Sequence, residues 1–150
     1  MPVLTATSKT LATIARNSMI TSAEEFIKLR ASNSKDEQDR ATHEAAEISV
    51  WWDVINKYPD YKTWVVHNKT VPVEILELLA QDPSATIRSE VARKRKISDM
   101  IFKLLAKDPE EAVRHALISN RKLPKGKLHL IQISGSAWLQ AALKDRLSNE

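Results

Sequence analysis

The feature that most constrains this chain of 150 residues is a segment that recurs with a period of 26 residues. Residues 78–83 (LLAQDP) align with residues 104–109 (LLAKDP) at that shift, and residues 64–72 (WVVHNKTVP) match residues 116–124 (ALISNRKLP) at a shift of 52, which is twice the period. Upstream the match weakens, and residues 54–59 align with 78–83 at a shift of 24. Self-similarity at a period of this length is typical of repeat proteins, whose units stack on their neighbours. We therefore expect about three repeats of 24–26 residues.

Each repeat is predicted to contain two short helices. The Asp-Pro pairs at 82–83 and 108–109 are typical helix starts, with Asp as the N-cap residue and Pro in the first helical position. The other helix of each repeat is expected to begin near Pro72, Ser98 or Pro124. Its apolar residues follow the i, i+3, i+4 spacing of an amphipathic helix, and a single helix cannot bury such a stripe alone.

The fold class predicted from these patterns is all-α. More specifically, we expect a short right-handed α-solenoid of helix-pair repeats with atypical capping helices, because each terminal unit has one face in water. The scarcity of glycine supports this prediction, since the chain has only two, Gly126 and Gly135. Hairpin turns and phosphate-binding loops need positive φ angles or close backbone approach, so a chain this poor in glycine is unsuited to them.

The predicted domain organisation is a leader or extra helix at residues 1–21, followed by a single helical-repeat domain at 22–150. The leader is rich in Ser and Thr and carries no acidic residue, a faint likeness to a targeting segment. A C-terminal capping helix is expected at residues 136–148, with Trp138 and Leu139 facing the last repeat.

Three serines are predicted to cap helices. Ser22 with Glu25, and Ser34 with Glu37, have the spacing of a capping box at a helix start. Ser136 is expected to be the N-cap of the last helix, with the preceding glycine ending the segment before it.

Taken together, the Leu-Leu-Ala-x-Asp-Pro segment and the Ile/Val-Arg pair after it resemble the leucine-rich repeat variant family and HEAT-like repeats. The resemblance covers about residues 50–133. It implies an α-helical solenoid in which Asp and Arg side chains form a ladder between repeats, and Asp82, Arg88, Asp108 and Arg114 have the matching spacing. Variant repeats are also known with a cysteine-bound iron–sulfur cluster, which this cysteine-free chain cannot hold. Such a fold is almost uninformative about activity.

No catalytic, metal or cofactor site is predicted. The segment His43-Glu44-Ala45-Ala46-Glu47 falls short of the zinc-protease helix, which needs a second His where Glu47 stands. The absence of cysteine excludes thiolate chemistry and is compatible with a reducing compartment. No run of 18 apolar residues is present, so no membrane span is expected and we predict a cytoplasmic location.

Adjacent tryptophans at 51 and 52 point about 100° apart on a helix. The geometry predicts that Trp52 packs in the core and that Trp51 is partly exposed, although burial of both rings is an alternative. Tryptophan is enriched in binding hot spots, so Trp51 is a candidate contact for a partner.

Basic residues gather in the turns between the helices, and equivalent turns of stacked repeats lie on one edge. The partner-binding residues predicted here are Arg93, Lys94, Arg95, Lys96, Arg121 and Lys122. A purely solvated edge is one interpretation. An electrostatic footprint for an acidic protein or for phosphates is the other, since Arg suits carboxylate and phosphate groups.

The sequence therefore favours a non-enzymatic, protein-binding helical-repeat module, monomeric, with an acidic protein as a candidate partner. A bacterial toxin-neutralising immunity protein is one specific form of this hypothesis. The alternative is a HEAT-like nucleic-acid-binding protein that uses the basic ridge between helices. A net charge of only +4 is modest for that role.

Overall fold

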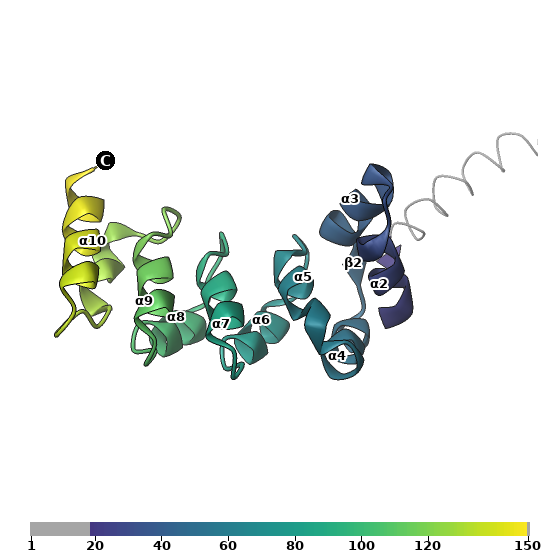
Figure 1. Ribbon diagram of the computed structural model, residues 1–150, viewed down its shortest axis with the longest axis horizontal. Coiled ribbons are helices and arrows are strands. Elements are labelled where there is room, and N and C mark those ends of the chain that lie inside the picture. Colours follow the sequence, from purple (N-terminus) through teal and green to yellow (C-terminus); the bar gives the residue numbers. More distant parts are fainter. Residues whose placement is uncertain (1–18, 150) are drawn as a thin grey trace, which may run out of the picture. The chain divides into compact units, whose positions relative to one another are not determined.

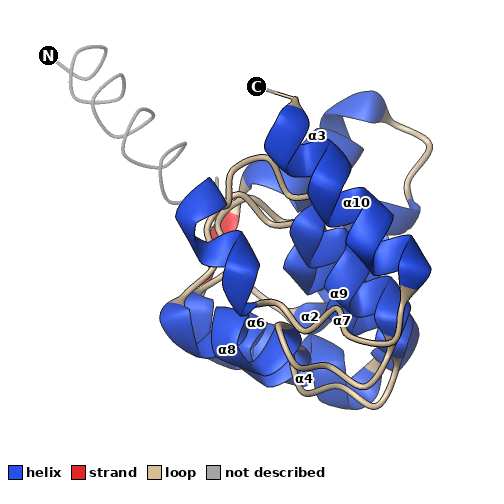
Figure 2. Cartoon of the chain, turned by 90° about the vertical axis from the view of Figure 1, so that its left-hand side faces the viewer, coloured by secondary structure: helices blue, strands red, loops and turns tan. Residues whose placement is uncertain are grey.

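The computed structural model describes residues 19–149 of the chain, which are mostly helical, so the all-α prediction is confirmed. Figure 2 shows helices joined by loops and one short strand pair. The described residues divide into two compact units at residue 72, one coloured purple to teal and the other teal to yellow in Figure 1. The predicted leader at 1–21 lies almost entirely outside the described residues, and the single domain at 22–150 stays a prediction.

The first unit contains five helices and two short strands among its described residues. They are β1 (Met19–Ile20), α2 (Ala23–Ala31), α3 (Lys35–His43), β2 (Ala45–Ala46), α4 (Ile48–Lys57), η1 (Pro59–Tyr61) and α5 (Lys62–His67). The strands pair in parallel, Met19 with Ala45 and Ile20 with Ala46. Helix α2 packs against both α3 and α4.

Two of the predicted serine caps start helices of this unit. The hydroxyl of Ser22 accepts from the backbone N–H of Glu25 at 3.0 Å, and that of Ser34 accepts from Glu37 at 3.3 Å. The carboxylate of Glu25 accepts from the N–H of Thr21 at 2.7 Å, one residue before the cap. Both helix starts are therefore as predicted, because each hydroxyl satisfies an N–H group that has no partner within the helix.

The second unit repeats the 26-residue period in its elements. They are α6 (Val73–Leu79), α7 (Ala85–Ala92), α8 (Asp99–Leu105), α9 (Glu111–Ile118), η2 (Lys125–Leu130) and α10 (Ala137–Ser148). The starts of α6, α8 and η2 are 26 residues apart, and so are those of α7, α9 and α10. Helices α7, α9 and α10 stand side by side, and α6 packs on α8 (Figure 1).

In the second unit, one leucine of each Leu-Leu pair is buried in the core. Leu79 and Leu105 are buried, whereas Leu104 is partly exposed on the surface of α8. Ile131 takes the same buried place after η2, and Leu130 is exposed. The repeated pair thus supplies one core residue and one surface residue in each repeat, because neighbouring positions on a helix point about 100° apart.

The Asp-Pro pairs do not begin the helices as predicted. The N-cap residues are Ser84 for α7 and Glu110 for α9, two positions later. The carboxylates of Asp82 and Asp108 accept from the N–H of Ser84 and of Glu110 respectively, each at 2.9 Å. These bonds form a turn stabilised by the Asp side chain ahead of the helix, a conformation that competes with direct capping.

The arginines of the motif join successive repeats. Nε of Arg88 donates to Oδ2 of Asp108 at 2.7 Å and Nη2 donates to Oδ1 at 3.1 Å, while Nη1 donates to the Asp82 carbonyl at 2.7 Å. Arg114, one repeat later, donates instead to the carbonyl of Gln132 at 2.7 Å, since that repeat has no Asp-Pro pair after it. The helix that caps this end begins as predicted, with Ser136 accepting from Leu139.

None of the helices within residues 19–149 combines the length and apolar character needed to cross a bilayer.

Candidate partner-binding site

A buried asparagine brings the two predicted basic turns of the second unit together. Nδ2 of Asn120 donates to the carbonyls of Ala92 and Lys94, both at 2.8 Å, and Oδ1 accepts from the N–H of Lys122 at 2.9 Å. The turn after α7 is thereby tied to the turn after α9. The two turns that carry the six predicted basic residues consequently lie side by side in this unit.

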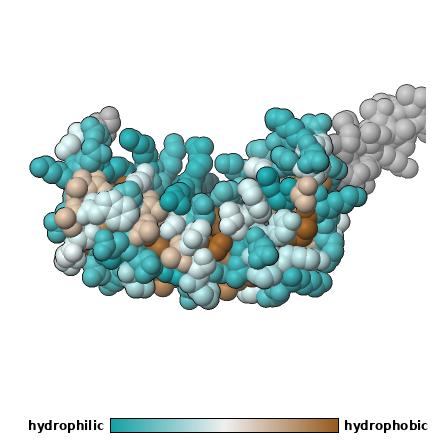
Figure 3. Space-filling view, viewed as in Figure 1, coloured by the Kyte–Doolittle hydropathy of each residue, from teal (hydrophilic) through white to brown (hydrophobic). Residues whose placement is uncertain are grey.

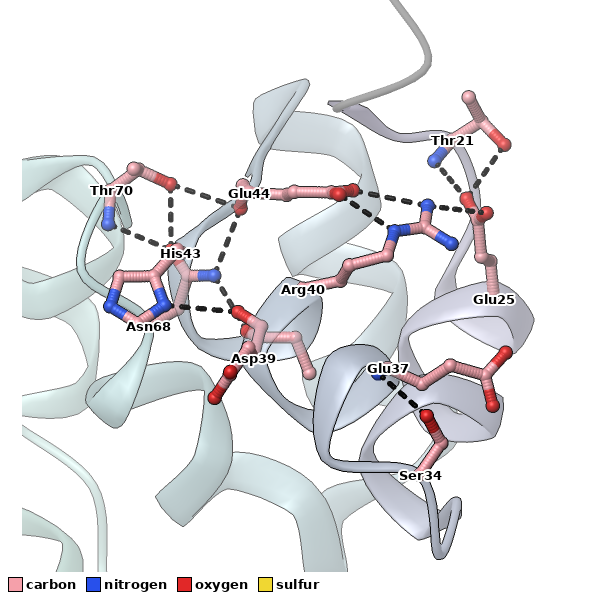
Figure 4. A network of polar contacts seen from close by, with 11 residues as sticks. Thr21, Glu25, Ser34, Glu37, Asp39, Arg40, His43, Glu44, Asn68 and Thr70 are labelled. Atoms are coloured by element: carbon pink, nitrogen blue, oxygen red, sulfur yellow. Dashed lines mark hydrogen bonds and ion pairs between the residues drawn. The ribbon is translucent and has the colours of Figure 1, made fainter. Parts of the chain in front are cut away.

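In the first unit, a buried asparagine makes the same kind of contact between turns. Nδ2 of Asn68 donates to the carbonyls of Ala41 and Glu44 at 2.8 and 2.9 Å, and its Oδ1 accepts from the N–H of Thr70 at 2.8 Å (Figure 4). Arg40 lies nearby, with its guanidinium against the carboxylate of Glu44 at 2.6 Å. The sequence match between residues 64–72 and 116–124 therefore reflects a shared structural role of the asparagine.

We call the predicted group of cations the basic edge: Arg93, Lys94, Arg95, Lys96, Arg121 and Lys122. Five of its six side chains are exposed, and Lys94 is half-buried. Arg93 lies 3.6 Å from the carboxylate of Glu90 on the preceding turn. Within residues 19–149, Arg95, Lys96, Arg121 and Lys122 form no ion pair. These four exposed cations of the edge therefore have no carboxylate partner within the described residues.

An aromatic pair lies on the adjoining face of the same unit. The imidazole of His115 on α9 stacks on the indole of Trp138 on α10, with ring centroids 4.2 Å apart and planes inclined by 10°. Trp138 is still 50% exposed. It contacts the last repeat as predicted, but much of its ring faces solvent, which the sequence did not predict. We call these two residues the aromatic pair.

The fold does not require an aromatic residue at position 138. The equivalent residues of the two preceding repeats, 26 and 52 positions earlier, are Ala112 and Thr86. The same comparison places Ser89 and Ala141 at the positions equivalent to His115. Because small residues serve the fold at these sites, the two rings are additions to the repeat rather than part of it. This comparison is the sequence signal that would have identified Trp138.

Arg93 links the aromatic pair to the basic edge. The pKa of His115 lies below its ordinary value of 6.5, chiefly because burial disfavours the charged imidazolium and also because of the nearby guanidinium of Arg93. The lowered pKa favours the neutral imidazole, whose Nδ1 lies 3.4 Å from the hydroxyl of Ser119. Arg93 of the basic edge is thus close enough to the aromatic pair for its charge to act on His115.

Small residues lie about one helical turn from each ring of the aromatic pair. Ala112 on α9, Ser119 at its C-cap and Ala141 on α10 are exposed. Figure 3 shows pale and tan atoms over this part of the second unit, next to the teal of hydrophilic residues. The face offers partly apolar surface at the border of a charged edge.

The prediction that Trp52 packs in the core while Trp51 is partly exposed is wrong. Trp51 is fully buried and meets Phe26 edge to face, with centroids 5.1 Å apart, while Trp52 is 42% exposed. The reason lies in the packing of α4 on α2, which directs residue 51 toward Phe26. Trp51 therefore presents no surface to a partner, and it does not belong to the candidate site.

The remaining chemical candidates do not assemble into a site. His43 ends α3 and Glu47 is the N-cap residue of α4, so the two side chains do not share a helix face. Among residues 19–149, no three His, Cys, Asp or Glu side chains are grouped so that they could hold a metal ion.

The chain matches no protein-family model, no curated protein and no solved structure.

Proposed function

We propose that this chain is a protein-binding helical-repeat module that recognises an acidic partner along the basic edge. The observation that carries the proposal is the Asn120 contact, which joins two turns that carry four exposed cations without an ion pair in the described part of the chain, Arg95, Lys96, Arg121 and Lys122. A short α-solenoid of the HEAT-like or leucine-rich repeat variant type is part of the proposal. The 26-residue spacing of α7, α9 and α10 supports that arrangement.

The electrostatics of the edge favour a carboxylate-bearing surface. Uncompensated cations grouped on one side raise the local potential, which speeds encounter with an anionic partner and disfavours cationic ones. Arg95 and Arg121 each present a planar fork of donors that matches a carboxylate in a two-point contact. Both side chains are exposed and need not break an internal ion pair to bind.

Two observations favour a protein over a nucleic acid. The formal net charge is only +4, and acidic residues share the helices of the edge, with Glu90 beside Arg93. A nucleic-acid-binding domain usually concentrates more positive charge along its surface. The aromatic pair adds exposed apolar area, which is typical of the core of a protein interface.

The test compares two variants of equal charge. Arg95→Glu with Arg121→Glu reverses two cations of the basic edge, whereas Lys103→Glu with Lys107→Glu reverses two cations on α8 and the turn after it. Each pair of reversals lowers the formal net charge from +4 to 0. An affinity pull-down from the native cell should recover a stoichiometric acidic protein with the wild-type chain and the control variant, and lose it with the edge variant.

Recovery of the same partner by the edge variant would contradict the proposal. Binding of a duplex or an RNA that falls steeply with salt would instead support the nucleic-acid alternative, since each phosphate contact releases a counterion.

The proposal includes a cytoplasmic location, and a toxin-neutralising immunity protein is its most specific form. In that case the partner is a toxin encoded beside this chain. Co-expression of the chain with that toxin should restore growth, and the Arg95→Glu, Arg121→Glu variant should not.

A further inference from the structure

We infer that the aromatic pair is the anchor point at which the acidic partner places an aromatic side chain, with its carboxylates on the basic edge. The inference rests on the proposed function and adds to it the kind of residue that the partner contributes. Its basis is the stack of His115 on Trp138, an exposed pair of rings that the repeat does not need.

The indole of Trp138 is held in place before any partner arrives. Its contact with His115 at 4.2 Å restricts the ring, while half of its surface stays accessible. A pre-ordered aromatic loses little conformational freedom on binding, which is one reason why tryptophans dominate binding energy in interfaces. A second aromatic ring can stack on the indole or meet its edge, as aromatic pairs prefer.

Short side chains lie about one helical turn from the aromatic pair. Ala112 and Ser119 stand three residues before and four residues after His115, and Ala141 stands three residues after Trp138. All three are exposed. The exposed part of the indole therefore has short side chains among its neighbours along the helix.

The local charge selects against a cationic side chain at this point. Lysine and arginine also bind indole faces, so they are the natural competitors of an aromatic residue. The guanidinium of Arg93, however, is close enough to lower the pKa of the His115 imidazole. The four cations of the basic edge without an ion pair, Arg95, Lys96, Arg121 and Lys122, oppose a cationic partner, whereas an uncharged ring flanked by carboxylates meets no such cost.

The experiment uses synthetic peptides of equal length as probes. The first is a run of glutamates with a central phenylalanine, the second has alanine in that place, and the third replaces the glutamates of the first with lysines. Dissociation constants are measured at neutral pH and low salt by calorimetry with the full chain. The phenylalanine peptide should bind the wild-type chain about tenfold or more tightly than the alanine peptide.

Three variants identify the ring responsible. Trp138→Ala should bind the phenylalanine and alanine peptides equally well, and Trp138→Phe should restore part of the difference because it keeps a ring. Trp52→Ala is the control, since it removes another exposed tryptophan, which lies in the first unit, and should leave the difference unchanged. Circular dichroism of each variant checks that its helices are intact.

The possible results separate the inference from the proposed function. Equal binding of both glutamate peptides to the wild-type chain overturns the inference and leaves the acidic-partner proposal standing. The inference also fails if Trp138→Ala keeps the preference for phenylalanine. Tighter binding of the lysine peptide, or no binding of any glutamate peptide, overturns both.

Discussion

Replacing Asn120 with alanine tests the contact that builds the basic edge. The wild-type side chain is buried and makes three hydrogen bonds, two from Nδ2 to the carbonyls of Ala92 and Lys94 and one to Oδ1 from the N–H of Lys122. Alanine removes all three and leaves two acceptors and one donor without these partners. The turn after α7 then loses its side-chain tie to the turn after α9.

The expected loss of stability follows from the number of bonds. A hydrogen bond between neutral groups contributes about 0.5–1.5 kcal/mol net, so three of them predict a loss of about 2–4 kcal/mol in the free energy of unfolding. Asn120→Asp should cost at least as much, since aspartate still accepts from Lys122 but places a carboxylate against two carbonyl oxygens.

The assay is urea denaturation followed by circular dichroism, combined with amide hydrogen exchange. Exchange at Lys122 should accelerate, because its N–H loses the acceptor on Asn120. Asn68→Ala in the first unit is the matched variant, since Asn68 makes the same three kinds of bond. A loss below about 0.5 kcal/mol for Asn120→Ala, with unchanged exchange at Lys122, would refute the reasoning.

Three further predictions concern the scaffold and the aromatic pair. Asp108→Asn should lower the free energy of unfolding by about 3 kcal/mol, because it leaves the largely buried guanidinium of Arg88 without its carboxylate. Denaturation of Asp108→Asn, Arg88→Met and the double variant should show that the double variant loses less stability than the two single variants together. Trp51→Ala should cost about 3–5 kcal/mol by opening a cavity, and Trp52→Ala less than about 1 kcal/mol, as measured by urea denaturation. The pKa of His115 is lowered in the folded state, so protonation of its imidazole favours the unfolded chain. Stability should therefore fall as the pH drops below about 6.5, and His115→Gln should remove that part of the pH dependence.

Each of these predictions has a result that contradicts it. Additive losses in the Arg88 and Asp108 cycle would mean that the two side chains do not interact. A small effect of Trp51→Ala would mean that its ring is not in the core. An unchanged pH profile in His115→Gln would mean that the imidazole keeps the same pKa in the folded and unfolded chain.

The period of the chain was enough to predict the regular part of the fold. Leu-Leu pairs and Asp-Pro pairs in phase predicted α6 to α9 because stacked repeats must bury equivalent residues at equivalent depths. The helix starts were placed two residues early, since an Asp side chain that accepts from the chain ahead of a helix has the same sequence signature as one that caps it. The guanidinium of Arg88 also binds Asp108 of the next repeat, a contact that the local sequence does not contain.

The candidate site was predicted in part. The basic turns were recognised from their composition, and the structure adds the Asn120 bonds that align two of them. The choice between the adjacent tryptophans could not be made, because it depends on the place of Phe26 on a separate helix. Trp138 was read as a residue of the cap, although comparison with Ala112 one repeat earlier shows that the fold does not need it.

The most direct test of the central claim is site-specific photo-crosslinking in the native cell. A photoreactive residue is placed at Arg121, on the basic edge, or at Lys107, an exposed cation in the turn before α9. The account predicts a protein adduct from position 121, mapped by mass spectrometry to an acidic segment of one partner, and little or none from position 107. Equal adducts from the two positions, or adducts with nucleic acid alone, would contradict it.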